Sequence, residues 1–193
     1  MAGKLQRMQE RDRKDAGCRI RAATPEPQLA QQLADVLIDC VEGGASVSFM
    51  WPLTPARALQ FWHQVLASAQ RGERIVLVAE DDRSGSIEGT IQIVFALADN
   101  QPHRADIAKM LVHRRARRRG VGAALLQVAE EFALAAGRTL LVLDTVTGSD
   151  GERLYTRMGW QRVGVIPNYA LWPDGTPCDT TYFYKSLPAG RSP

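Results

Sequence analysis

The stretch "HRRARRRGVGAALL", residues 113–126, governs how the rest of the chain is interpreted. It places five arginines before two glycines and then turns apolar at helical spacing. Glycines at a helix start let backbone N–H groups approach an anion, and the helix terminus adds about half a positive charge. The stretch therefore predicts a strand-to-helix turn whose charge faces a nucleic-acid backbone, a phosphorylated small molecule, or solvent alone.

Length and composition are those of one ordinary globular domain. The chain has 193 residues, of which 45% are hydrophobic and 23% charged; this is enough for one sizeable core and short for two domains. Because 24 basic residues nearly balance 21 acidic ones, the formal net charge is only +3. The basic excess is local, which argues against a general nucleic-acid-binding protein.

The cysteines and the N-terminus indicate the redox state and the cellular location of the protein. Cys18, Cys40 and Cys178 are odd in number and far apart, without the spacing of metal ligands. We therefore expect reduced thiols, no disulfide framework and no metal. The N-terminus is polar and charged, unlike a secretory signal, and no apolar run approaches the ~18 residues of a membrane span. A cytoplasmic protein without membrane association is the default expectation.

Changes of hydrophobic period predict seven strands and four helices in a mixed α/β arrangement. Strands are expected at 18–23, 74–80, 87–97, 104–113, 139–145, 160–171 and 180–187, and helices at 24–40, 54–70, 120–136 and 149–159. Thr24 and Thr54, each followed by proline, are expected to cap the first two helices. Ser149 and Glu152 form a capping box in the fourth. The continuous apolar run at 139–145 predicts a strand buried on both faces.

The same patterns set the domain boundaries. Residues 1–17 are a charged extension, either a frayed tail or an exposed helix. Residues 18–187 form a single domain, and residues 188–193 form a C-terminal tail. Two nucleotide motifs fail at the glycine turn: Leu125 stands where a dinucleotide fingerprint needs its third glycine, and the Gly-Lys-Ser/Thr of a P-loop is absent.

The residues around this turn resemble a known family. "MLVHRRARRRGVGAALL" is similar to the Arg-x-x-Gly-x-Gly motif of the GNAT superfamily of acetyl-CoA-dependent N-acetyltransferases. "LYTRMGW" resembles the family's Leu-Tyr-x-x-x-Gly-Phe/Trp signature, and the resemblance covers roughly residues 18–187. "VEGGASVSFM", "LDT" and "TTYFYKSL" further resemble the branch that contains the tabtoxin-resistance acetyltransferase. The resemblance implies a GNAT-type sandwich: a mixed, mostly antiparallel sheet of roughly seven strands with a central splay and about four flanking helices.

The resemblance also implies a cosubstrate, acetyl-CoA, and the residues that hold it. The turn would bind the pyrophosphate through Arg117, Arg118, Gly120, Val121, Gly122 and Ala123. A bulged strand end at Met110, Leu111 and Val112 would bind the pantetheine arm through the backbone of its first and third residues. Arg114, Arg115 and Arg119 have no motif role and are either extra cations for the cosubstrate or solvated surface charge.

Catalysis needs a proton donor for the departing thiolate and a proton acceptor for the amine. Tyr155 occupies the family's general-acid position, although it also fits as a core tyrosine beside Leu154 and Met158. A backbone N–H of Leu111 or Val112 would stabilise the oxyanion. Asp106 and Asp144 are the candidate bases, acting through water or binding a cationic substrate. Asp106 fits equally well as an ordinary exposed strand residue.

One position departs from the family. Seven residues before Tyr155 the family commonly has asparagine, which orders the pantetheine arm or a water, and this chain has Gly148. The contact must be absent or supplied otherwise, for example by Ser149. This departure keeps open an acyl-CoA-binding pseudoenzyme or sensor as the alternative to an enzyme.

The acceptor and the partners are less defined. "GGASVSFMW" (43–51), with Phe49, Met50 and Trp51, and "PNYALWPDGTPCD" (167–179) would form the acceptor's walls or simply cover the core. The branch resemblance implies a primary amine on a small, amino-acid-like molecule and no nucleic acid. A homodimer is compatible with the sequence, which leaves the oligomeric state open. A serine or cysteine hydrolase is disfavoured because no Gly-x-Ser-x-Gly elbow is present.

Overall fold

The computed structural model describes residues 13–15, 17–24, 26–95 and 98–188. Within these residues, eight strands form one sheet in the order β1-β2-β3-β4-β5-β6-β8-β7. The elements are β1 (Arg13–Asp15), β2 (Cys18–Ala22), α2 (Leu29–Glu42), α3 (Pro55–Gln70), β3 (Arg74–Asp81), β4 (Ile87–Phe95), β5 (Arg104–Val112), a short 3-10 helix η1 (Arg114–Ala116), α4 (Val121–Ala135), β6 (Leu140–Val146), α5 (Asp150–Arg157), β7 (Gln161–Leu171) and β8 (Pro177–Ser186). The expected order of helices and strands is confirmed, with β1 as an additional short strand.

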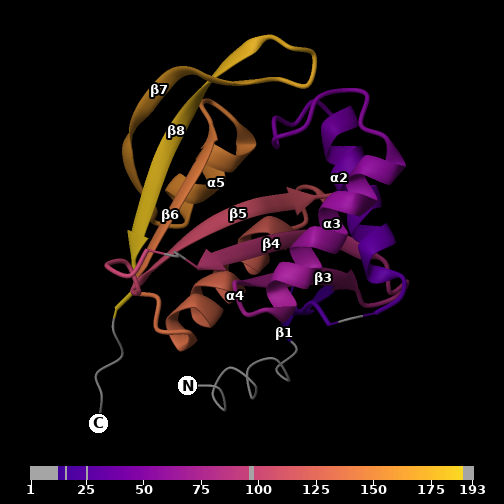
Figure 1. The fold of residues 1–193 in the computed structure, drawn as a ribbon, viewed down its shortest axis with the longest axis horizontal. Coiled ribbons are helices and arrows are strands. Elements are labelled where there is room, and N and C mark those ends of the chain that lie inside the picture. The colour runs from indigo at the N-terminus through magenta and orange to yellow at the C-terminus, as the bar shows by residue number, and fades with distance from the viewer. Residues whose placement is uncertain (1–12, 16, 25, 96–97, 189–193) are drawn as a thin grey trace.

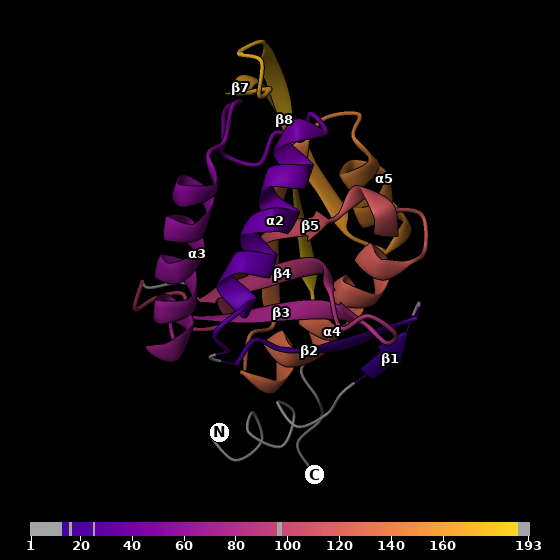
Figure 2. The same cartoon turned by 90° about the vertical axis from the view of Figure 1, so that its right-hand side faces the viewer.

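The helices cover the two faces of the sheet in pairs. Figure 2 shows α2 and α3 on one side of the sheet and α4 and α5 on the other. One core lies under α2 and α3 and includes the fully buried Leu37 and Trp62. The other lies under α4 and includes Leu125 and Phe132. The apolar stripes read from the sequence therefore face the sheet, and the mixed α/β class is confirmed.

The sheet opens at its centre. All neighbouring strands are antiparallel except β5 and β6, which run parallel over only three register pairs, from Arg104↔Leu140 to Asp106↔Val142. Beyond Asp106 the two strands diverge, β5 towards α2 and β6 alongside β8 (Figure 1). The backbone groups on this side of β5 therefore lose their partner strand, which places a gap in the middle of the sheet.

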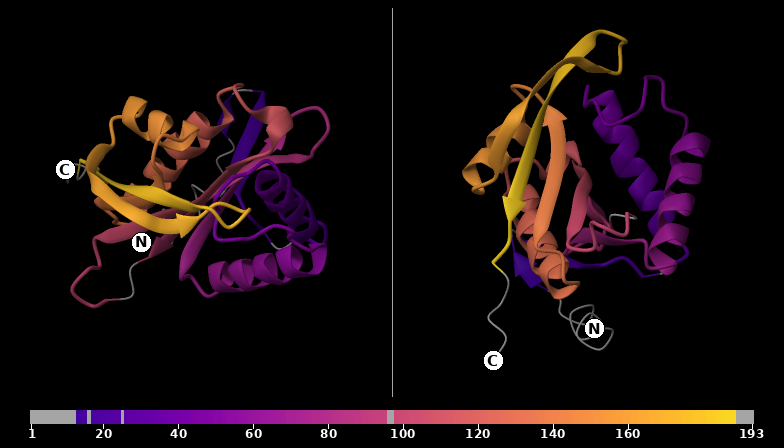
Figure 3. Two further views of the ribbon diagram at one scale, coloured as in Figure 1. Left: turned by 90° about the horizontal axis from the view of Figure 1, so that it is seen from above. Right: turned by 60° about the vertical axis from the view of Figure 1, so that its left-hand side comes forward.

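The two halves of the sheet meet again above this gap. The tip of the β7–β8 hairpin lies beside the segment that joins α2 to α3 (Figure 3). Ser46 Oγ donates to the Leu171 carbonyl at 2.6 Å, and the Trp51 N–H donates to the Pro173 carbonyl at 3.0 Å. These bonds tie the hairpin to the α2–α3 segment across the open end of the sheet.

Two local predictions are wrong. The first helix begins at Leu29 with Gln28 as N-cap, and Thr24 instead donates to the Glu26 carboxylate at 2.6 Å. Glu26 precedes Pro27, and a residue before proline is disfavoured in the helical region, so the helix starts later. β6 is buried on one face only, because Asp144 on its other face is exposed. That face borders the gap instead of a helix layer.

The other caps behave as predicted. Thr54 caps α3 by accepting a hydrogen bond from the Arg57 N–H at 3.3 Å. Ser149 Oγ accepts from the Glu152 N–H at 3.1 Å and begins α5. Within the stretch expected to be an extension, residues 13–15 form β1, which pairs with β2. Residues 1–12 and 16 of that extension, and residues 189–193 of the expected tail, lie outside the described residues.

Candidate active site

The gap between β5 and β6 continues into a cleft of about 980 Å³. All ten residues that the sequence assigned to the cosubstrate line it: Met110, Leu111, Val112, Arg117, Arg118, Gly120, Val121, Gly122, Ala123 and Ser149. Tyr155 and Asp144 line it too, whereas Asp106 is not among the lining residues. The fold therefore brings together almost every residue that the motifs singled out.

β5 carries a bulge where it enters the cleft. Thr90 pairs with Leu111 and Gln92 with Ala108, so that Lys109 and Met110 together oppose a single residue of β4. Such an extra residue bends a strand and shifts which groups face each side. The expected bulge is thus present, and it lies one residue earlier than the Met110–Val112 segment that the resemblance suggested.

The bulge decides which backbone groups are free. The His113 N–H donates to the Glu88 carbonyl of β4 at 2.9 Å, so His113 directs its backbone towards β4. Alternate residues of a strand direct these groups to opposite sides. Leu111 therefore also faces β4, whereas Met110 and Val112 face the gap, where β6 has diverged.

The start of α4 presents unpaired N–H groups to the cleft. Gly120 is its N-cap in the left-handed conformation, with φ +86°, and has no side chain to cap the helix. The first bond into the helix is from Ala124 N–H to the Gly120 carbonyl at 3.1 Å. The preceding N–H groups, those of residues 121–123, have no intrahelical acceptor. Together with the helix dipole they make a site for an anion.

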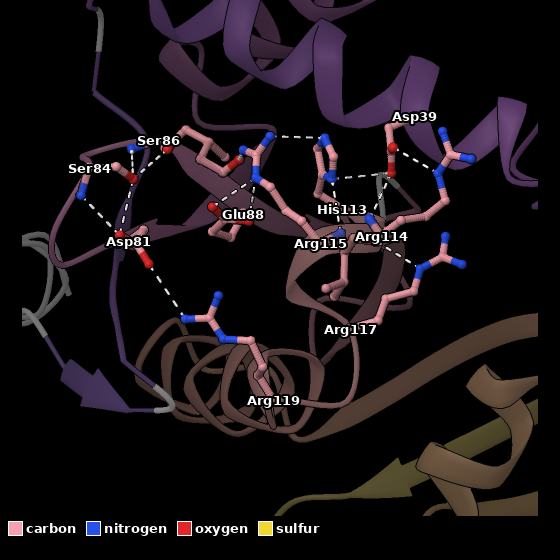
Figure 4. Close-up of polar contacts among 12 residues, drawn as sticks. Asp39, Asp81, Ser84, Ser86, Glu88, His113, Arg114, Arg115, Arg117 and Arg119 are labelled. Atoms are coloured by element: carbon pink, nitrogen blue, oxygen red, sulfur yellow. Dashed lines mark hydrogen bonds and ion pairs between the residues drawn. The ribbon is translucent and has the colours of Figure 1, made fainter.

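Two of the five arginines are held by buried carboxylates (Figure 4). Arg114 donates through Nε to Asp39 Oδ1 and through its backbone N–H to Oδ2, both at 2.8 Å. Arg115 Nε lies 2.9 Å from an oxygen of Glu88, whose side chain is only 5% exposed. Burial alone would raise the pKa of Asp39, but the hydrogen bonds from Arg114 and the nearby His113 hold it below its usual value. These arginines fix the turn to α2 and β4.

The remaining arginines divide between the surface and the cleft. Arg119 lies 3.5 Å from Asp81 at the end of β3. Arg117 donates from Nε to the Val112 carbonyl at 3.3 Å, and Arg117 and Arg118 both line the cleft. In the part of the chain that the structure describes, neither of these two forms an ion pair. Arg114, Arg115 and Arg119 are thus partly exposed surface charges, as one of the two alternatives expected, and each is ion-paired. Arg117 and Arg118 are the two arginines of this stretch that line the cleft.

Tyr155 is both a core residue and a cleft residue. Its side chain is 6% exposed and its ring lies 5.8 Å from Trp160 and 6.1 Å from Phe183. Among the described residues its hydroxyl makes no hydrogen bond. Burial raises the pKa of this hydroxyl, and the charge of Asp144 raises it further. Tyr155 therefore stays protonated at neutral pH and presents an unused donor.

The two candidate bases lie on the same face of the sheet in different surroundings. Asp144 is open to the cleft, and desolvation by the surrounding protein raises its pKa, with Lys109 opposing and Asp106 adding to the rise. Asp106 pairs with Arg104 at 2.6 Å, before the strands diverge. The structure therefore places only Asp144 where a bound amine could reach it.

Lys109 is a cleft residue that the sequence reasoning missed. Its Nζ donates to Ser48 Oγ at 2.8 Å and lies 6.0 Å from the centre of the Phe61 ring. Desolvation lowers the pKa of its ammonium, and Asp144 counteracts part of that effect. The signal available in the sequence was a single charge inside the apolar run "IAKMLV". The bulge that turns this side chain into the cleft could not be read there.

The family's asparagine position is occupied by an open turn. Gly148 has φ +76°, and a Cβ built on it would meet no atom within 4 Å. Its N–H donates to the carboxylate of Glu152, whereas the Ser149 N–H donates to the Val146 carbonyl, so only the Ser149 half of the expected capping box is formed. Ser149 lines the cleft and its Oγ lies 3.3 Å from Thr145 Oγ1. A hydroxyl thus stands beside the position where the family has an amide.

The expected acceptor walls form the far end of the cleft. Phe49 and Met50 line it from the α2–α3 segment, and Tyr169 and Leu171 line it from β7. Trp51 is 65% exposed and lines a smaller neighbouring groove instead of the cleft. The α2–α3 segment and the hairpin therefore both line this space. Phe49 also packs against the core under α2 and α3, so both alternatives read from the sequence are represented.

The cysteines, possible metal ligands and helix lengths complete the description of the site. All three cysteines are free and buried, although Cys40 borders the cleft. In the described ranges no cluster of three or more His, Cys, Asp or Glu side chains is arranged to hold a metal ion. None of the helices in those ranges is long and apolar enough to cross a membrane.

Comparisons with known proteins extend these observations. Residues 72–162 match the family described as "Acetyltransferase (GNAT) domain". The ribosomal-protein-alanine N-acetyltransferase of Brucella melitensis is 26% identical, with a TM-score of 0.72 over 87% of this chain and 99% of that one. The yncA protein of Salmonella typhimurium, assigned as an acetyltransferase and solved with its cofactor acetyl-CoA, is 18% identical, with a TM-score of 0.73 over 92% of this chain and 98% of that one. The likeness in fold therefore extends well beyond the matched segment.

Proposed function

From the match of residues 72–162 to the GNAT acetyltransferase domain and the likeness in fold to solved acetyltransferases, we propose that this chain is a GNAT N-acetyltransferase that acetylates the primary amine of a small, amino-acid-like molecule directly from acetyl-CoA. One observation carries the proposal. An uncapped helix start with two unpaired arginines and a buried tyrosine hydroxyl open into the same cleft. The acceptor class rests on the resemblance to the tabtoxin-resistance branch and on the enclosed acceptor end.

The residues at the turn suit the cosubstrate. Acetyl-CoA supplies the acetyl thioester and carries a pyrophosphate and a ribose phosphate. The N–H groups of residues 121–123, with Arg117 and Arg118, would hold the phosphates by charge-assisted hydrogen bonds. The backbone groups of Met110 and Val112 would bind the pantetheine arm as one strand binds another. Among the described residues, Arg117 and Arg118 form no ion pair with a carboxylate, although Asp150 also lines the cleft and lies within their electrostatic reach.

The remaining cleft residues fit the proton transfers of the reaction. An alkylammonium has a pKa near 10.4, so only about one amine in 10³ is neutral at pH 7 without assistance. Asp144 would accept the amine proton through water, and its raised pKa makes it a stronger base. Tyr155 would donate its proton to the thiolate as the new C–N bond forms and the C–S bond breaks. The Val112 N–H would stabilise the charge that develops on the carbonyl oxygen.

A second candidate acceptor comes from the comparison. The Brucella melitensis protein, at 26% identity, is named for acetylating an alanine of a ribosomal protein. A protein N-terminus would have to enter between the α2–α3 segment and the hairpin tip, which the Ser46–Leu171 and Trp51–Pro173 bonds hold together. This enclosure favours a small molecule over a protein chain.

The test is release of free thiol from acetyl-CoA in the presence of an amine panel. The panel contains free amino acids, simple amines and peptides with free N-termini. We expect calorimetry to detect acetyl-CoA binding and turnover to occur with free amino acids in preference to peptides. Turnover with peptides alone would favour the second candidate. The proposal is wrong if acetyl-CoA gives no binding heat or no amine in the panel releases thiol.

A further inference from the structure

Lys109 is a charged group of the cleft that the proposed chemistry does not use. Its Nζ is held by Ser48 Oγ at 2.8 Å and lies 6.0 Å from the Phe61 ring centre. The three residues come from β5, from the α2–α3 segment and from α3. The ammonium is therefore fixed where these elements meet the acceptor end of the cleft.

This ammonium has no carboxylate partner among the residues that the structure describes. Asp144 acts on it electrostatically across the cleft, yet no ion pair within 4.0 Å joins the two. Lys185, by contrast, lies 2.7 Å from the carboxylate of Glu130. Two opposite charges thus face the same space with room between them. A group carrying both charges would satisfy both residues at once.

The backbone at this position supports a functional role. Lys109 has φ +47°, in the left-handed region, which costs a residue other than glycine about 1–2 kcal/mol. Bulges of this kind commonly re-aim a side chain beside an active site. Here the bulge directs the half-buried Lys109 into the cleft, and the cost is a left-handed backbone conformation at that residue.

We propose that Lys109 binds the carboxylate of the acceptor while Asp144 faces its amine, so that the enzyme selects zwitterionic amino acids. This inference rests on the proposed function. A substrate carboxylate beside Nζ would favour the ammonium form and offset its desolvation. Ser48 would orient the ammonium, and Phe49 and Met50 would contact the acceptor's side chain. Lys109 is then a specificity-determining residue, separate from the proton transfers.

The proposal also distinguishes the two acceptor classes. In a free amino acid the amine lies one carbon from a carboxylate. In a peptide N-terminus the same position is a neutral amide, which gives an ammonium no charged partner. If Lys109 binds the carboxylate, the enzyme should discriminate against peptides because they carry a neutral amide at that position.

The experiment compares amino acids with their amides and their decarboxylated amines in the thiol-release assay. A charge-assisted hydrogen bond contributes about 1.5–3 kcal/mol, so kcat/KM should favour the acid over its amide by at least about tenfold. Lys109→Met should abolish this preference, because it raises KM for the acid far more than KM for the amide. Lys109→Arg should retain part of it. Arg57→Met is the matched control, because Arg57 stacks 5.8 Å from the Phe49 ring outside the cleft.

Each other outcome is decisive. An unchanged preference in Lys109→Met, or an equal fall of kcat for every acceptor, overturns the inference and leaves the proposed function intact. Acetyl-CoA binding without thiol release from any acceptor removes the proposed function and this inference with it. If Lys109→Met does not fold, Lys109→Asn replaces it, because asparagine tolerates the left-handed conformation.

Discussion

At the scale of single residues, Tyr155 combines two requirements that usually exclude each other. A buried tyrosine is expected to find a hydrogen-bond partner, yet its hydroxyl bonds to no described residue. Its ring packs against Trp160 and Phe183, so the hydroxyl is held in place and can still donate a hydrogen bond. A donor that is rigid and unpartnered is suited to a group that arrives with the substrate.

The corresponding prediction concerns Tyr155→Phe. This change removes one oxygen and keeps the packed ring, so we expect the fold and the affinity for acetyl-CoA to be nearly unchanged. Turnover should fall at least about tenfold, since general acid catalysis contributes about 10²–10⁴-fold. The rate of thiol release measures turnover, and calorimetry measures the affinity for acetyl-CoA. A variant with unimpaired turnover would remove Tyr155 from the chemistry.

Asp81 gives a prediction about acid stability. Hydrogen bonds from the backbone of Ser84 and Arg83 lower its pKa from 3.8 to about 2. Because the folded pKa lies below the ordinary one, folding is stabilised above about pH 4, and that stabilisation is lost as pH falls towards 2. The free energy of unfolding, measured in urea from pH 5 to pH 2, should therefore decline less in Asp81→Asn than in the unmodified protein. The neighbouring exposed Asp82→Asn serves as control and should decline as the unmodified protein does.

At the scale of elements, the arginine-rich turn divides its charge between structure and ligand. Arg114, Arg115 and Arg119 bind carboxylates of α2, β4 and the end of β3. The unpaired Arg117 and Arg118 line the cleft. The five arginines of this turn therefore have two roles. Three hold the loop in place through ion pairs, and two line the cleft, where they are available to an anion.

This division predicts different effects for adjacent substitutions. Arg118→Gln should weaken acetyl-CoA binding about tenfold or more, because it removes a charge-assisted contact of about 1.5–3 kcal/mol. Arg119→Gln is the matched control and should leave the affinity nearly unchanged. It should cost at most about 1 kcal/mol of stability, because its ion pair with Asp81 is long, at 3.5 Å, and the arginine is 42% exposed. Calorimetry at two salt concentrations measures both affinities; equal losses would contradict the division.

Local signals were sufficient to predict most elements. The caps at Thr54 and Ser149 were readable because each depends on neighbours three residues away. The ion pair of Arg114 with Asp39 was not, because it joins residues 75 positions apart. Asp106 was a candidate base because a sequence does not reveal where two strands stop pairing. Lys109 was overlooked for a related reason, since its direction depends on a bulge.

At the scale of the whole molecule, the central gap is the feature that a ligand would change most. In the free protein, the N–H groups of Met110 and Val112 face a region that β6 has left. An extended ligand arm laid along β5 would replace the missing strand. In the described part of the chain, no strand pairs with β5 on this side beyond Asp106.

Amide hydrogen exchange tests this arrangement. The Met110 and Val112 amides should exchange rapidly in the free protein and slow markedly with saturating acetyl-CoA. The His113 amide, bonded to the Glu88 carbonyl at 2.9 Å, should be protected in both states and is the internal reference. Equal protection of Met110 and Val112 with and without acetyl-CoA would show that the arm does not lie along β5.

The carboxylates that hold the arginine-rich turn, Asp39, Asp81 and Glu88, all precede it in the chain. A ribosome synthesises a protein from its N-terminus, and domains begin to fold as they emerge. When residues 113–119 leave the exit tunnel, each of their ionic partners has already been made. The arginine-rich turn can therefore be anchored during translation, before Tyr155 and the β7–β8 hairpin have left the tunnel.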